Sequence, residues 1–178
     1  MNLFIGSSSV EEIPQKYLND TKIYLDKLLK DNNLIFGAYN HGIMGLSYEA
    51  ALNNNNEITS IVPELNKNDL LELNSTKEII TKDTPDRTTA MFKSSDALIF
   101  LPGGIGTLYE LFASLECTRN HEVNVPIIIY NSCNFFDEIL TFLDKLYEEK
   151  FIKTKVKELY HISNNAEDTL EFLNNYYK

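Results

Sequence analysis

The sequence is poor in arginine and cysteine. Only two arginines occur, Arg87 and Arg119, and the 178 residues carry a formal net charge of −10. This charge argues against a nucleic-acid polymer or an anionic membrane as partner, because both require a basic face. The two cysteines, Cys117 and Cys133, have no cysteine or histidine at ligand spacing. We therefore predict neither a disulfide framework nor a metal site, and we expect both thiols to be buried apolar side chains.

The sequence also lacks a long apolar run. No segment approaches the roughly 20 residues needed to cross a bilayer. Residues 1–5 lead straight into Gly6 and serines without a basic or an extended apolar region, so we expect a cytoplasmic protein. A hydrophobic content of 43% in a chain of this length is ample for one core, which predicts a single domain over residues 1–178.

Short apolar runs alternate with amphipathic segments along the chain. Strands are expected at residues 3–5, 34–36, 58–62, 79–80, 97–101, 126–130 and 159–162. Helices are expected between them and at the end of the chain, at about residues 17–29, 46–51, from 84, 108–116, 135–147 and 167–177, whereas residues 64–76 are expected to form a polar surface loop. This alternation predicts a Rossmann-like α/β fold with a mostly parallel sheet and helices on both faces. A ligand crevice is then expected at the carboxyl ends of the strands.

The most informative stretch runs from Ala97 to Glu116, where an apolar strand meets a helix through Pro102-Gly103-Gly104-Ile105-Gly106-Thr107. Glycines there allow successive main-chain N–H groups to converge on an anion at the positive end of the helix. Gly103, Gly104, Gly106 and Thr107 are therefore candidate phosphate-binding residues.

Glu110 follows Thr107 by three residues and has two interpretations. It is either a functional carboxylate beside a bound phosphate or the capping-box partner of Thr107 at the start of the helix. Arg87, at the start of the helix expected from Thr84, is likewise either a functional cation or a surface partner of Asp83 or Asp86.

Two further polar turns are expected at the same edge of the sheet. Gly6-Ser7-Ser8 follows the first strand, and residues 37–45 follow the second. His41 in the second turn is either a base-contacting group or a solvated side chain. His121 and His161 have no partners at catalytic or metal spacing and are interpreted as structural.

Residues 102–110 match the PGGxGTxxE signature of the Lonely Guy (LOG) family, the cytokinin riboside 5′-monophosphate phosphoribohydrolases that are often labelled lysine decarboxylase-like. Residues 4–8 resemble the opening strand and serine turn of that family, and Gly42-Ile43-Met44-Gly45 resembles its GLMG element. Arg87 and Met91 stand where the family has the arginine and the later methionine of its MHxRKxxM segment. The resemblance extends over most of the chain.

The resemblance implies hydrolysis of the N-glycosidic bond of a nucleoside 5′-monophosphate, with release of the free base and ribose 5-phosphate. It implies Glu110 and Arg87 as the catalytic residues. A carboxylate near C1′ can stabilise an oxocarbenium-like sugar or activate water. The implied substrate-binding residues are Gly6, Ser7, Ser8, Gly42, Met44, Gly45, Gly103, Gly104, Gly106 and Thr107. Self-association as a homodimer or larger assembly is implied as well, through the aromatic-rich helices between Leu108 and Tyr147.

The sequence departs from the family pattern at two places. Where the family has three consecutive glycines, only Gly37 remains, followed by Ala38 and Tyr39. Pro85 and Thr88 replace the histidine and the lysine around the arginine, and the loss of the lysine puts phosphate affinity or substrate identity in doubt. The alternative function is a non-catalytic nucleotide sensor or cofactor carrier on the same fold. A true lysine decarboxylase is disfavoured, because no lysine stands in a pattern typical of a pyridoxal phosphate Schiff base. We expect no cofactor.

Overall fold

The computed structural model describes residues 1–153 and 155–178, and within them the strands form one seven-stranded sheet in the order β4-β3-β2-β1-β5-β6-β7. Every pairing in these residues is parallel. The strands are β1 (Asn2–Gly6), β2 (Asn33–Phe36), β3 (Ile58–Pro63), β4 (Lys77–Thr81), β5 (Ala97–Phe100), β6 (Ile127–Tyr130) and β7 (His161–Ser163).

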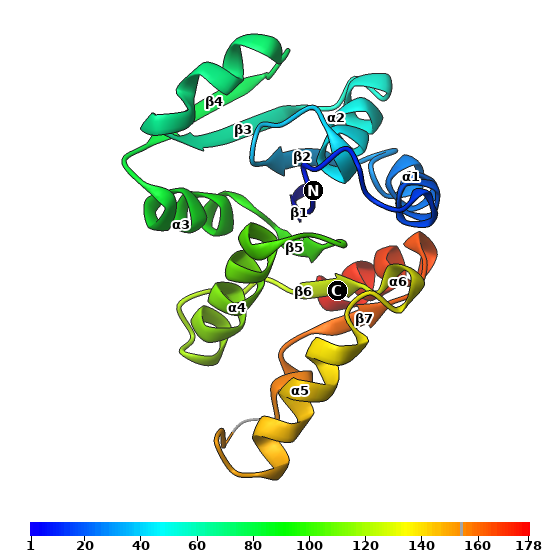
Figure 1. Cartoon of the computed structure of the whole chain (residues 1–178), viewed down its shortest axis with the longest axis vertical. Helices are drawn as coiled ribbons and strands as arrows, with labels where there is room; N and C mark the ends of the chain where they lie inside the picture. Colours follow the sequence, from blue (N-terminus) through cyan, green and yellow to red (C-terminus); the bar gives the residue numbers. More distant parts are fainter. Residues whose placement is uncertain (154) are drawn as a thin grey trace.

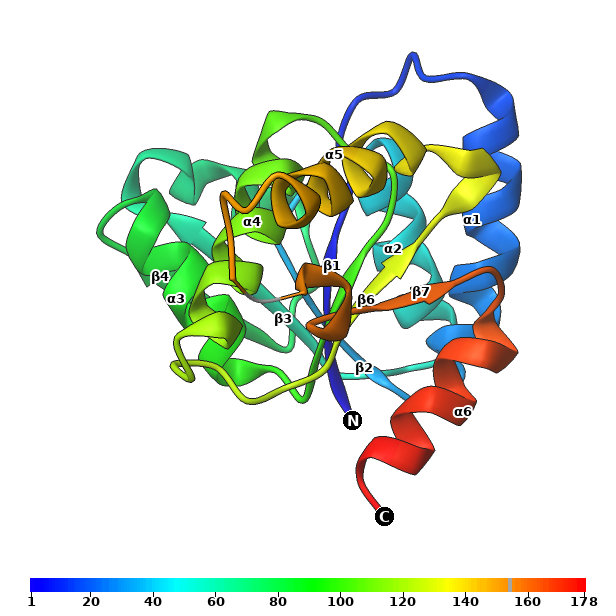
Figure 2. The same cartoon turned by 90° about the horizontal axis from the view of Figure 1, so that it is seen from below.

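Six α-helices of the described residues cover both faces of the sheet (Figures 1 and 2). They are α1 (Gln15–Leu28), α2 (Gly42–Asn53), α3 (Thr84–Ser94), α4 (Ile105–Arg119), α5 (Asp137–Glu148) and α6 (Ala166–Tyr176). Helices α1, α2 and α6 pack into one apolar cluster with alternate strand residues, and α3, α4 and α5 pack into a second cluster on the opposite face. The central strands β1, β2, β5 and β6 are buried on both faces, which explains their continuous apolar runs. The predicted fold class is confirmed.

The strand order reverses between β1 and β5. Strand β1 is followed in space by β2, β3 and β4 on one side and by β5, β6 and β7 on the other. In a parallel sheet such a reversal leaves a crevice at the carboxyl ends of the two strands, because the connections leave toward opposite faces. Gly6 ends β1 and Phe100 ends β5, so the serine turn and the glycine-rich turn both begin at this crevice.

Two sequence predictions are wrong. Residues 64–76 are not simply an irregular loop, because Glu64–Glu72 form a 3₁₀ helix and Leu70 is buried against Ala38 and Val62. The cysteines are not both buried apolar groups: Cys117 is partly buried, and Cys133 is exposed in a short 3₁₀ segment, Ser132–Asn134, with φ of 48°.

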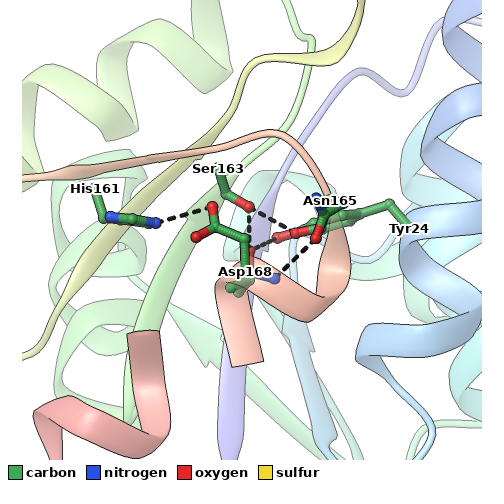
Figure 3. Close-up of polar contacts among 6 residues, drawn as sticks. Tyr24, His161, Ser163, Asn165 and Asp168 are labelled. Carbon is green, nitrogen blue, oxygen red and sulfur yellow. Dashed lines mark hydrogen bonds and ion pairs between the residues drawn. The ribbon is translucent and has the colours of Figure 1, made fainter. Parts of the chain in front are cut away.

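A polar network that is buried at Tyr24, Ser163 and Thr169 and partly exposed at His161 and Asp168 ties α6 to α1 and β7 (Figure 3). The hydroxyls of Tyr24 and Thr169 are 2.8 Å apart, and Thr169 donates to Ser163 over 2.7 Å. The Nε2 of His161 is 3.0 Å from a carboxylate oxygen of Asp168, and its ring stacks on Phe172. His161, for which the sequence indicates no partner, therefore links β7 to α6 through Asp168 and Phe172.

Candidate functional site

A cleft of about 210 Å³ opens at the crevice between β1 and β5. Its walls are formed by the serine turn, the segment after β2, the start of α3 and the start of α4. Most of the site residues predicted from the sequence line it: Ser7, Ser8, Met44, Arg87, Gly104, Gly106, Thr107 and Glu110. Its other lining residues were not predicted as site residues: Phe4, Ile5, Ser9, Val10, Gly37 and Tyr39.

Backbone hydrogen bonds hold the turns around the cleft together. The N–H of Ser8 donates to the carbonyl of Pro102 over 3.0 Å, and the N–H of Met44 donates to the carbonyl of Ser8 over 2.9 Å. The N–H of Leu101 donates to the carbonyl of Gly6 over 2.9 Å. The serine turn, the glycine-rich turn and the segment after β2 therefore form one connected edge, as the sequence predicted. The predicted turn over residues 37–45 is shorter than expected, because residues 42–45 already form the first turn of α2.

Gly42, Gly45 and Gly103 are not among the residues that line this cleft. Gly42 has φ of +60°, and a Cβ there would lie 2.5 Å from the carbonyl oxygen of Val10. A Cβ on Gly45 would lie 2.5 Å from a backbone oxygen, and one on Gly103 would lie 2.1 Å from Oγ1 of Thr107. These glycines are needed for close packing of the turns. Their predicted contact with substrate remains a prediction, because none of them lines the cleft.

The start of α4 leaves main-chain donors facing open space. Gly104 is the N-cap, and within the described residues no side chain caps this end. The first N–H groups of a helix have no acceptor inside the helix, and the helix dipole makes this end attractive to anions. A Cβ on Gly104 or on Gly106 would meet nothing within 4 Å. This end of α4 can therefore accept an anion without steric obstruction.

Glu110 is not the capping-box partner of Thr107. Helix α4 begins at Ile105, so Thr107 is its third residue and Glu110 lies in the second turn. Its side chain is 8% exposed, and Oε1 accepts a hydrogen bond of 2.8 Å from Nη2 of Arg87. Arg87 does not pair with Asp83, which instead caps α3 by accepting from the N–H of Asp86. The structure thus brings together the arginine and the glutamate that the sequence singled out.

The electrostatics of the pair are set by burial. Burial raises the pKa of Glu110 to about 7, although the charge of Arg87 acts in the opposite direction. These two are the charged side chains among the cleft-lining residues of the described chain. The cleft therefore holds a carboxyl group that exchanges its proton near neutral pH, which is a property of general acids and bases.

Two polar atoms at the cleft wall lack a hydrogen-bond partner within the described residues. They are Oγ of Ser7, a residue that is 4% exposed, and Nε of Arg87. Buried polar atoms are normally paired, and exceptions are concentrated at functional sites. Both atoms belong to residues that line the cleft, so a bound ligand with acceptor oxygens would have donors available there.

The departures from the family pattern have clear structural outcomes. Ala38 has φ of 65°, so the backbone keeps the left-handed conformation expected of glycine at that place. Thr88 is 3% exposed, its hydroxyl donates to the carbonyl of Thr84, and it does not line the cleft.

His41 pairs with Glu11 over 2.7 Å and is about half exposed, and it is not among the residues that line the cleft.

The described residues contain no group of three or more His, Cys, Asp or Glu side chains that could hold a metal ion. Among the helices of the described chain, none combines the length and the apolar character needed to span a bilayer.

The fold and the cleft define a Rossmann-like α/β protein with its site at the switch point of a parallel sheet. Residues 44–173 match the family described as possible lysine decarboxylase. The chain therefore belongs to this family, the LOG family, and the resemblance drawn from residues 102–110 is confirmed.

Individual relatives support this assignment. The cytokinin riboside 5′-monophosphate phosphoribohydrolase LOG2 of Arabidopsis thaliana is 29% identical over 177 residues, which cover 98% of this chain and 82% of that protein. The probable cytokinin riboside 5′-monophosphate phosphoribohydrolase LOG6 of Arabidopsis thaliana is 32% identical over 155 residues, which cover 84% of this chain and 75% of that protein. Among solved structures, the Moco carrier protein of Chlamydomonas reinhardtii has a TM-score of 0.70 at 14% identity, over 98% of this chain and 96% of that one. This last likeness concerns the fold alone.

Proposed function

We propose that the protein hydrolyses the N-glycosidic bond of a nucleoside 5′-monophosphate, releasing the base and ribose 5-phosphate. The observation that carries the proposal is the buried Arg87–Glu110 pair, which shares a cleft with the uncapped start of α4. The relatives named as cytokinin riboside 5′-monophosphate phosphoribohydrolases support the same reaction.

The mechanism follows from these groups. The N–H groups of α4 and the Thr107 hydroxyl hold the 5′-phosphate. The C1′–N bond breaks with its electron pair leaving on the base, and the ionised Glu110 stabilises the cationic sugar and accepts a proton from the attacking water. Arg87 fixes one oxygen of that carboxylate. The water oxygen forms the new bond to C1′, the departing base takes up a proton from solvent, and Glu110 returns the proton it accepted to solvent, so that one water molecule is added across the broken bond.

The test is chromatographic detection of free base from AMP and from isopentenyl-AMP, which extends the proposal to cytokinin nucleotides. Glu110→Gln is expected to lower kcat by about 10²- to 10⁴-fold, the usual contribution of a positioned general base. The chain offers a matched control in Glu116→Gln. Glu116 lies on the same helix and pairs with Arg119 over 2.6 Å, but both side chains are exposed.

Glu116→Gln is expected to release base as the wild-type protein does. No release from any nucleoside monophosphate by the wild-type protein would contradict the proposal. Nucleotide binding without turnover would instead favour the sensor or carrier function.

A second, apolar hollow beside the cleft is suited to an apolar substituent on the nucleotide. It has a volume of about 270 Å³, adjoins the cleft at Ser8, Val10 and Gly104, and is walled by apolar groups that include Ile13 and Phe135. We expect isopentenyl-AMP to be preferred over AMP, and Ile13→Ser to reduce the ratio of the two kcat/KM values. An unchanged ratio in this variant would exclude the hollow as the site of the substituent.

We also propose self-association through α4 and α5. Large apolar side chains are exposed on both helices: Ile105, Tyr109, Phe112, Phe142 and Tyr147. Light scattering after size-exclusion chromatography tests this directly. Phe112→Glu is expected to yield monomers because it places a charge on the apolar surface, and a monomeric wild-type protein would contradict the proposal.

A further inference from the structure

The carboxyl group of Glu110 lies beside Gly6, at the end of β1. The parallel register of β1 and β5 pairs Gly6 with Phe100. A Cβ built on Gly6 would lie 3.0 Å from Cδ1 of Phe100 and 3.2 Å from Oε2 of Glu110. The ring and the carboxyl group therefore occupy the space that any side chain at position 6 would need.

The two oxygens of Glu110 have different surroundings. Oε1 accepts the hydrogen bond from Arg87, whereas Oε2 lies over Gly6. Phe100 is fully buried, and its ring packs edge-on against the ring of Phe4 at 5.8 Å. Since close-packed interiors yield little, the ring cannot move aside without disturbing the core.

We propose that Gly6 is a positioning residue for Glu110: its missing side chain sets the place of Oε2, and the Phe100 ring is the apolar floor beneath. Gly6 does not line the cleft, so it acts through the carboxyl group and not by touching substrate. This inference rests on the proposed function, in which Glu110 acts at C1′. It assigns to Gly6 a different role from the substrate contact predicted from the sequence.

Gly6→Ala tests the position of the carboxyl group. The new methyl group would force its neighbours to move by a few tenths of an ångström. Misplacement of a reacting group by about 1 Å costs about 10²-fold, so a loss in kcat of about tenfold is expected here, with KM nearly unchanged.

Phe100→Leu tests the floor without adding bulk. The smaller side chain lets water approach Glu110, so the midpoint of the kcat/KM pH profile should fall toward the ordinary value of a carboxyl group.

Ile99→Val is the matched control for general weakening of the core. Ile99 precedes Phe100 in β5, is fully buried, and packs in the cluster on the opposite face of the sheet. The change costs about 1 kcal/mol of stability. It should leave kcat and the pH midpoint at their wild-type values, because it does not touch the floor beneath Glu110.

A measurement independent of turnover separates this inference from the proposed function. The pH midpoint for titration of the Glu110 carboxyl group, measured by ¹³C NMR of its carboxyl carbon, should shift in Gly6→Ala and in Phe100→Leu but not in Ile99→Val. Shifts of this kind in a protein that releases no base would support the positioning role and contradict only the proposed reaction. Unshifted titrations in both variants, with wild-type kcat in Gly6→Ala, would overturn the inference.

Discussion

Glu110→Gln should stabilise the protein at alkaline pH while removing its activity. Glu110 has a folded-state pKa of about 7, raised by burial from 4.5. The stabilising effect of its proton is complete below pH 4.5 and is lost as the pH rises through about 7. At pH 8 the ionised carboxylate therefore costs about 3 kcal/mol relative to the protonated form. Glutamine is neutral at every pH and avoids that cost, while its amide oxygen can still accept from Arg87.

Urea unfolding of the two proteins between pH 4.5 and 8 measures this difference. With an m-value of about 2 kcal/mol/M, the unfolding midpoint of Glu110→Gln at pH 8 should exceed that of the wild type by about 1.5 M. The gap should close toward pH 4.5. Glu116→Gln should show no gain at pH 8, because its ion pair with Arg119 lowers the pKa of Glu116. A midpoint for Glu110→Gln equal to or below the wild type at pH 8, or a gap that does not depend on pH, would refute the reasoning.

Three other predictions concern the backbone, the thiols and the polar network. Ala38→Gly should raise the free energy of unfolding by about 1 kcal/mol, because φ of 65° strains alanine but not glycine; an unchanged urea midpoint would contradict this. In the folded protein a thiol reagent such as dithionitrobenzoate should modify the exposed Cys133 first and Cys117 later, since burial raises the pKa of Cys117; mass spectrometry of partly modified protein gives the order. Tyr24→Phe should cost about 1 kcal/mol by removing the hydrogen bond to Thr169, and thermal unfolding with no loss of stability would exclude that contribution (Figure 3).

The fold could be predicted from the sequence because its signals are local. Buried runs such as Ile127–Tyr130 alternate with amphipathic segments such as Asp137–Glu148, and that pattern is typical of a parallel sheet between helices. The 3₁₀ helix Glu64–Glu72 was missed because its sequence is polar and has no helical period. The exposure of Cys133 was missed because it depends on a turn with positive φ, which a cysteine does not indicate.

Part of the candidate site could be predicted for the same reason. Arg87 and Glu110 lie on α3 and α4, the helices directly before and after β5, and both helices pack on the same face of the sheet. The short strand between them brings the two side chains within 2.8 Å. The cleft residues Phe4 and Tyr39 gave no such signal, because a strand phenylalanine and a loop tyrosine are far more often core or surface groups.

The comparison of the two arginines shows what the fold adds to the sequence. Arg87 and Arg119 each pair with a glutamate on α4, over 2.8 Å and 2.6 Å. On the exposed pair, water solvates both charges, so its contribution to stability is small. In the buried pair, removal of the Glu110 carboxyl group from water makes its ionisation costly in spite of the arginine. The same two residue types therefore give a surface contact at one end of the helix and a proton-exchanging group at the other, and burial is the physical difference between them.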